Sequence, residues 1–173
     1  MFAKHIYIDS NRTAQIIWFC ALLIGYWLLL KFTSAPGFPM GDLTMEGNFA
    51  SYIDRSILPG KLYLTIHDPE GLMSTIPAIS TGLLGILTGS YLKNKDINGG
   101  KKAVNMAMLG IIFIGLALLW NLDFPINKNL WTSSFVLTVG GISLMLLSIF
   151  YYILDVLGYR RWSFFFLFFM FLY

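Results

Sequence analysis

The sequence is poor in charge and nearly free of cysteine. Only 12% of its 173 residues are charged, about half of the quarter that soluble domains carry. The single cysteine, Cys20, excludes a disulfide framework within the chain. The sequence has no glycine-rich phosphate loop, no Cys/His metal-ligand spacing and no Gly-x-Ser-x-Gly elbow. It therefore predicts no metal site and none of the nucleotide or serine-hydrolase sites that these motifs mark.

Apolar residues make up 57% of the chain and lie in long uninterrupted blocks. A helix needs about 20 residues to cross a bilayer. Blocks of about this length predict four full transmembrane helices, over 14–31, 74–92, 103–120 and 131–154. The first block is too long for a cleaved signal peptide, and no small-residue cleavage site follows it. A last aromatic run over 162–173 would give only about 18 Å of helix. This is too short to cross the membrane, so the run predicts only part of a fifth transmembrane helix.

The predicted fold class is therefore all-α, a polytopic transmembrane helix bundle forming one domain over 1–173. Residues 32–73 separate the first two helices, and a loop of that length tends to be functional or disordered. Its Tyr, Phe and Ile content predicts a partly folded cap lying on the membrane. Gly85 with Gly89, and Gly140 with Gly141, are predicted to let helices pack closely.

The distribution of basic residues predicts the orientation, because cytoplasmic loops carry an excess of Lys and Arg. With a cytoplasmic N-terminus, the inner side holds Lys4, Arg12, Lys93, Lys95, Lys101, Lys102, Arg160 and Arg161. The outer side then holds only Lys31, Arg55, Lys61 and Lys128, together with Asp42, Glu46, Asp54, Asp68, Glu70 and Asp123. This topology explains the net charge of +3 better than nucleic-acid binding does, and it places the loop and the connector before the fourth helix on the same outer side.

The most informative stretch is His67-Asp68-Pro69-Glu70-Gly71, at the start of the second helix. Two carboxylates beside an imidazole could do acid–base work. The alternative is a capped helix start, with Asp68 accepting from free N–H groups and Glu70 favoured by the helix dipole. A start at Ser74 would place Pro77 in the first turn, where proline is tolerated.

The stretch Pro125 to Trp131 (PINKNLW) sets Lys128 between Asn127 and Asn129 just before the fourth helix. These groups suit a sugar, a phosphate or a carboxylate. The alternative is an interfacial turn in which Asn129 caps the helix and Trp131 lies at the headgroups.

A third stretch, Tyr52-Ile53-Asp54-Arg55, lies in the long loop. Adjacent acid and base favour a structural role, in which Tyr52, Asp54 and Arg55 fix the loop through charge-assisted hydrogen bonds. No charged residue lies in the middle of a predicted helix, which argues against a proton relay or an ion path.

These motifs occur in one family in the same order: YIDR, DPEG followed by Ser-Thr-Ile, PINKNLW, and Asp-x-x-Gly after the fourth helix. From about Ala14 to Trp162 the chain resembles the heparan-α-glucosaminide N-acetyltransferase family and its bacterial relatives. The resemblance implies a multi-helix membrane protein that takes an acetyl group from cytosolic acetyl-CoA and delivers it to a terminal glucosamine on the far side. Some bacterial relatives are labelled amino-sugar transporters.

Two departures from the family limit what the resemblance implies. The family's proposed catalytic histidine lies in an N-terminal portion with no counterpart here, so His67 does not inherit that role and the catalytic residue stays unidentified. The family's Pro-Phe and Gly-Met-Asn motifs are replaced by SFFFLFFMFLY. These departures at the two ends predict that the chain is a fragment of a longer domain and is inactive alone. It would need the missing N-terminal helices, or it would assemble as a homo-oligomer.

The resemblance implies a substrate-binding set that meets an amino sugar or glycan, formed by Asp68, Glu70, Asn127, Lys128 and Asn129. On the inner side, basic residues could attract the phosphates of CoA, although membrane topology alone explains them: Lys93, Lys95, Lys101, Lys102, Arg160 and Arg161. Three hypotheses remain open: an acyltransferase in a bacterial inner membrane, an amino-sugar transporter, and a non-catalytic remnant.

Overall fold

The computed structural model describes residues 12–58, 60 and 62–159. Its helices are α2 (Arg12–Phe32), α3 (Phe49–Ile57), α4 (Thr75–Lys93), α5 (Gly99–Trp120) and α6 (Ser133–Tyr151), which continues into the π-helical turn η1 (Tyr152–Val156). The described residues form no β-strand, apart from an isolated bridge between Leu62 and Thr65. The all-α prediction is confirmed. The predicted partial helix over 162–173 lies outside the described residues.

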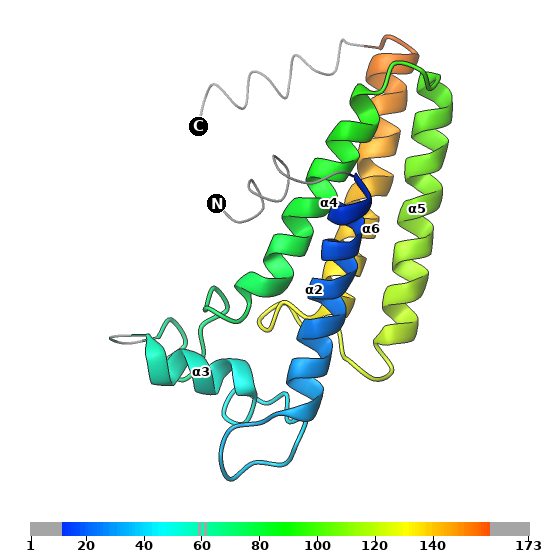
Figure 1. Cartoon of the computed structure of the whole chain (residues 1–173). Helices are drawn as coiled ribbons and strands as arrows, with labels where there is room; N and C mark the ends of the chain where they lie inside the picture. The colour runs from blue at the N-terminus through cyan, green and yellow to red at the C-terminus, as the bar shows by residue number, and fades with distance from the viewer. Residues whose placement is uncertain (1–11, 59, 61, 160–173) are drawn as a thin grey trace.

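Four of these helices run side by side as one bundle, and the short α3 lies across one end of it (Figure 1). Within the described residues, α2, α4, α5 and α6 with η1 are long and apolar enough to cross a membrane. Most of their residues are not buried inside the bundle, as expected for helices whose outer faces contact lipid tails. The protein is therefore an integral membrane protein with four candidate spans.

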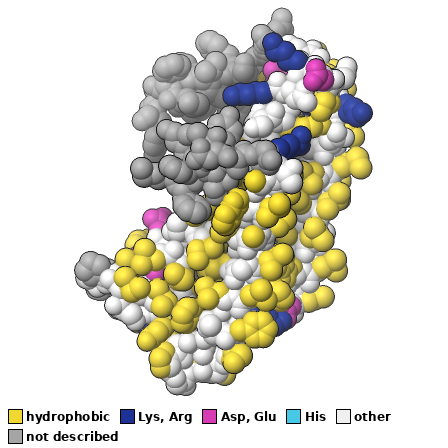
Figure 2. Space-filling view, in the orientation of Figure 1, with side chains coloured by type: hydrophobic (Ala, Val, Ile, Leu, Met, Phe, Trp, Pro, Cys, Tyr) yellow, Lys and Arg dark blue, Asp and Glu magenta, His cyan; other side chains and the backbone are white. Residues whose placement is uncertain are grey.

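The bundle has a cap end and a turn end. The cap end carries the cap (residues 33–74) and the connector (residues 121–132) between α5 and α6. The turn end is where residues 94–98 join α4 to α5 (Figure 1). Hydrophobic side chains cover the length of the helices, and most of the Lys and Arg side chains visible in Figure 2 gather at the turn end.

The helix starts correct two details of the sequence interpretation. Helix α4 begins at Thr75 after Ser74, so Pro77 lies in its first turn and Asp68 is too far upstream to cap it. Helix α6 is capped by Thr132, whose side chain accepts from the amide of Phe135. The alternative that Asn129 caps this helix is therefore wrong.

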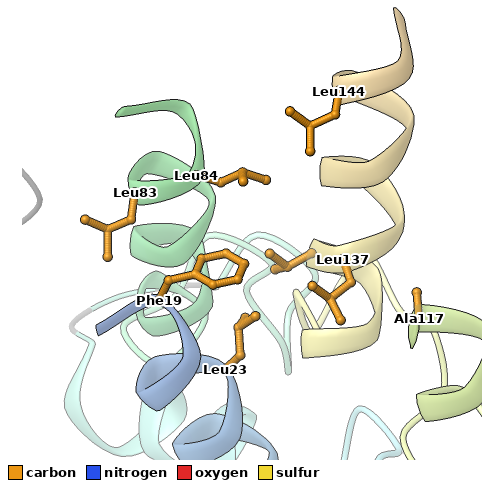
Figure 3. Packing of buried hydrophobic residues seen from close by; sticks show 8 residues of the cluster. Phe19, Leu23, Leu83, Leu84, Ala117, Leu137 and Leu144 are labelled. Carbon is orange, nitrogen blue, oxygen red and sulfur yellow. The ribbon is translucent and has the colours of Figure 1, made fainter. Parts of the chain in front are cut away.

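The core consists of two apolar clusters stacked along the bundle. The larger joins all four long helices, and Figure 3 shows Phe19 and Leu23 of α2, Leu84 of α4 and Leu137 of α6 pointing into the space between them. The second lies at the cap end and includes Tyr26, Leu30, Ala50, Phe124 and Leu130. Because Ala50 belongs to α3 and Phe124 to the connector, this cluster packs the cap onto the bundle.

Glycines allow a close approach between α5 and α6. A Cβ atom on Gly110 would lie 2.7 Å from the carbonyl oxygen of Gly141, and a Cβ on Gly141 would lie 2.7 Å from that of Gly110. Gly140 similarly faces Leu84. For Gly85 and Gly89 close packing stays a prediction, because no atom of the described residues lies within 4 Å of a Cβ at either position.

Replacing Gly110 by alanine is expected to destabilise the bundle by about 1–3 kcal/mol, since an overpacked contact must move two helix backbones apart. The matched control is Gly115→Ala on the same helix, where a Cβ meets nothing within 4 Å. That change should be neutral or slightly stabilising, because alanine is the better helix former. Unfolding in detergent measures both variants, and equal effects would contradict the close α5–α6 contact.

Candidate functional site

The cap is built around α3. Asn48 begins this helix by accepting a hydrogen bond from the amide of Ser51 at 2.7 Å, a standard N-cap arrangement. Arg55 donates to the carbonyl oxygens of Met45 (3.2 Å), Glu46 (2.7 Å) and Ile66 (2.8 Å). One guanidinium therefore joins the chain before α3 to the chain after it.

Asp54 supports the segment that carries the DPEG sequence. Its side chain is 1% exposed and accepts from the amide of Leu72 at 2.9 Å. Its carboxylate also occupies the place that a Cβ on Gly71 would take, only 1.9 Å from that position, so only glycine fits there. Burial raises the pKa of this carboxyl above its usual range, and the charge of Asp68 raises it further.

Asp54 and Arg55 thus bond to different backbone segments rather than to each other. Tyr52, on the same helix, is half-buried with its ring packed against Phe49. Their loop-fixing role stays a prediction, and these contacts are the means by which it would operate.

The DPEG segment forms a turn held by its own first residue. The carboxylate of Asp68 accepts from the amide of Glu70 at 2.9 Å, and the carbonyl of Asp68 accepts from the amide of Gly71 at 3.1 Å. Asp68 is half-buried, whereas Glu70 is exposed. One oxygen of Asp68 is therefore engaged within the turn, and the Glu70 carboxylate faces outward.

The connector is held in a similar way. The side-chain oxygen of Asn127 accepts from the amides of Asn129 (2.9 Å) and Leu130 (3.3 Å). The hydroxyl of Thr132 donates to the carbonyl of Pro125 at 3.0 Å and accepts from the amide of Asn127 at 3.0 Å. The turn between them exposes Lys128. Its ammonium has no ion-pair partner within the described residues, where the pair recorded is Lys31 with Asp123.

His67 joins these two turns. Its Nε2 lies 3.0 Å from the carbonyl oxygen of Asn129, and its Nδ1 lies 2.7 Å from the hydroxyl oxygen of Ser51. Because a carbonyl oxygen only accepts, Nε2 donates, and in the neutral imidazole Nδ1 accepts the Ser51 hydroxyl proton. His67 is 2% exposed. Both nitrogens are thus occupied in a buried link, which leaves neither free for a substrate.

The result is a junction at the cap end, defined here as the Ser51–His67–Asn129 link with its flanking turns. It brings α3, the DPEG turn and the connector together, although His67 and Asn129 are 62 residues apart. Asp68 follows the link directly on one side and Lys128 precedes it directly on the other. The structure therefore brings the five predicted substrate-binding residues to two neighbouring turns, with Glu70 and Lys128 the most exposed.

Helix α2 holds the connector from the other side. The hydroxyl of Tyr26 donates to the carbonyl of Leu130 at 2.7 Å. Lys31 forms an ion pair with Asp123, and the indole of Trp27 donates to the same carboxylate at 2.8 Å. The hydrogen bonds from Lys31 and then Trp27 lower the pKa of Asp123. The connector is therefore fixed at both of its ends.

Sequence reasoning missed Ser51 and Tyr26 as parts of this arrangement. Neither carried a usable signal, because each acts on a partner that only the fold brings near. Gly71 carried a weak one, since a glycine that ends the Asp-Pro-Glu-Gly stretch is compatible with a close approach by another group. Trp131 is not simply a headgroup anchor, because its ring packs against Phe135 and its indole lies 3.4 Å from the hydroxyl of Thr81.

At the turn end, the basic residues differ in availability. Lys102 is buried and its ammonium donates to the carbonyl of Leu92 at 2.7 Å, which satisfies the end of α4. Lys93, Lys95 and Lys101 are exposed, so they remain open to an anion. Arg160 and Arg161 lie outside the described residues, and the described residues contain no group of three or more His, Cys, Asp or Glu that could hold a metal ion.

Comparison with known proteins identifies relatives of this chain. No family model matches it. It is 32% identical to the heparan-alpha-glucosaminide N-acetyltransferase of Homo sapiens over 82% of its own length, and 35% identical to that of Mus musculus over 76%. The chain spans about a quarter of the length of these curated relatives, 26% and 25% respectively. It is therefore a distant, partial-length relative of heparan-alpha-glucosaminide N-acetyltransferase.

Proposed function

We propose that the chain is a segment of a membrane-bound acyltransferase that moves an acetyl group from cytosolic acetyl-CoA to an amino sugar or glycan. The observation that carries this proposal is the similarity to two N-acetyltransferases over about four-fifths of the chain. The acceptor would bind on the face where the cap lies, and the N-terminus would be cytoplasmic in a bacterial inner membrane.

The junction supports an acceptor site because its two turns present opposite charges and amide groups. The exposed Glu70 carboxylate, with Asp68 two residues before it, suits the ammonium of an amino sugar. The exposed Lys128 ammonium and the amide of Asn129 suit hydroxyl or carboxylate oxygens. The side-chain oxygen of Asn127 accepts from two backbone amides. Asn127 would therefore act mainly by positioning Lys128 and Asn129.

Acetyl transfer requires the amine of the acceptor to be unprotonated. Its nitrogen forms a bond to the thioester carbonyl carbon, the carbon–sulfur bond breaks, and the amine proton leaves while the thiolate gains one. Acetyl-CoA would supply the activated acetyl group, and Lys93, Lys95 and Lys101 would hold its phosphates at the turn end, so the acetyl group would have to cross the bundle to reach an acceptor at the cap end. The base is not assigned to this chain, because the imidazole of His67 is occupied on both sides.

The transporter alternative would use the same polar junction without chemistry. The spans give it little support. No charged residue lies within 13–30, 75–92, 103–120 or 133–154. Coupled transporters commonly place ionisable groups near the middle of the membrane.

The test uses membrane vesicles from the source cells and from cells lacking this gene. Labelled acetyl-CoA is supplied to the cytoplasmic side and glucosamine to the other side, and labelled N-acetylglucosamine is measured. We expect the product in the first preparation and its loss in the second, with recovery when the gene is restored. Entry of unmodified glucosamine that depends on the gene, without acetylation, would support the transporter. Unchanged acetylation in both preparations would leave the remnant hypothesis.

A further inference from the structure

A groove of about 540 Å³ lies between α2, α4 and α5, away from the junction and on the half of the bundle nearer the turn end. Leu144 of α6 forms part of its wall. Its size is in the range of small-molecule sites, about 300–1,000 Å³. Its walls are three candidate membrane spans, so the groove lies within the depth of the bilayer.

The groove is polar at one end and apolar at the other. Arg12 at the start of α2, Tyr91 near the end of α4 and Asn105 near the start of α5 line the polar end. The amide of Asn105 donates to the hydroxyl of Tyr91 at 2.7 Å. The two side chains thus form one polar pair beside the arginine.

Seven or eight residues further along the same three helices the lining changes to Phe19, Leu84 and Phe113. At 1.5 Å per residue this is about 10–12 Å deeper into the bundle. Phe19 stacks on Phe113 with ring centroids 5.9 Å apart. This deep part offers no partner for a charged or strongly polar ligand.

The charge at the polar end is positive. Arg12 is exposed in the groove lining, which contains no acidic residue. Three lysines are exposed at the same end of the bundle, namely Lys93, Lys95 and Lys101. The exposed acids among the described residues of that end are Asp96 and Asp155. Figure 2 shows Lys and Arg side chains gathered there.

We propose that this groove binds one phospholipid with an anionic headgroup. Its acyl chain lies along Phe19, Leu84 and Phe113, and its phosphate meets the guanidinium of Arg12, with the Tyr91–Asn105 pair near the ester oxygens. Basic pockets between membrane helices favour anionic headgroups, and the apolar depth suits a hydrocarbon tail. This site is separate from the junction and does not depend on the proposed acyl transfer.

The test is native mass spectrometry of the full chain. The chain is purified in detergent, mixed with either a phosphatidylglycerol or a phosphatidylcholine that has the same acyl chains, and then released from the detergent in the spectrometer. We expect one phosphatidylglycerol to be retained more strongly than phosphatidylcholine. Arg12→Gln should weaken phosphatidylglycerol binding about fivefold, the effect of one basic residue near an anionic surface. Lys95→Gln removes an exposed lysine of the same end that lies outside the lining, and it should weaken binding much less than Arg12→Gln.

A second pair of variants tests the apolar part. Cys20, the chain's single cysteine, lines the groove, so Cys20→Trp should fill it and reduce retention of the lipid. Ile17→Trp on the lipid-facing side of α2, where Ile17 is 61% exposed, should not. Equal retention of the two lipids, or equal effects within either pair of variants, would overturn the proposal. Displacement of the lipid by added acetyl-CoA would overturn it in favour of a donor site.

Discussion

Replacing Lys128 by alanine is expected to lower acetyl transfer by about ten- to a hundredfold, the effect of losing one charged hydrogen bond to the acceptor. The structure makes this a clean experiment. Lys128 is exposed, and its ammonium has no ion-pair partner within the described residues. Its backbone carbonyl, which accepts from the amide of Trp131 at 3.1 Å, is retained in the variant. The fold should therefore be unchanged.

The measurement is labelled N-acetylglucosamine formed by membranes that contain either form, normalised to the amount of protein. Glu46→Ala is the matched control, since Glu46 is also an exposed charged residue of the cap end but lies outside the two turns of the junction. Glu70→Gln tests the opposite charge of the junction and should also lower transfer. If Lys128→Ala retains full activity, the connector does not contact the acceptor and the substrate-binding set is wrong.

Replacing His67 by alanine is expected to separate the cap from the connector, at a cost of about 3 kcal/mol. Two hydrogen bonds are lost, the Ser51 hydroxyl and the Asn129 carbonyl are left without these partners, and a cavity replaces a side chain that is 2% exposed. The helices should stay assembled, because the larger apolar cluster between them contains no residue of the cap.

Hydrogen exchange measures this effect directly, since local opening accelerates exchange without global unfolding. We expect amides of the DPEG turn and of the connector to exchange about a hundredfold faster, the factor that corresponds to about 3 kcal/mol. Amides in the middle of α5 should exchange as before. Tyr63→Ala is the control, because Tyr63 lies four residues from His67 but is 81% exposed. Matching exchange in the two variants would show that His67 does not hold the junction.

Much of the architecture was predictable from the sequence because the bilayer imposes a length and a composition on each span. The predicted range 14–31 compares with Arg12–Phe32 in the structure, and 103–120 with Gly99–Trp120. The structural ends depend on local capping, for example by Asn98, whose side chain accepts from the amide of Gly100. Hydropathy does not report such details.

The helix contacts were less predictable. All the helix glycines look alike in the sequence, yet Gly141 meets Gly110 on α5 whereas Gly85 faces no described atom within 4 Å. The difference lies in which face each helix turns toward its neighbour, and a helix that is apolar all round carries little signal of that face. Lys102 likewise looks like the other lysines of the turn end in the sequence, but its ammonium donates to the carbonyl of Leu92.

The sequence by itself determined the four spans, the loop with a partly folded cap, and the motifs that relate the chain to heparan-alpha-glucosaminide N-acetyltransferase. Only the tertiary structure decided that Asp54 supports the DPEG turn and that His67 joins this turn to the connector. The physical reason is that spans follow from the apolar content of contiguous residues, whereas a hydrogen bond between residues 62 positions apart depends on how the helices bring their ends together.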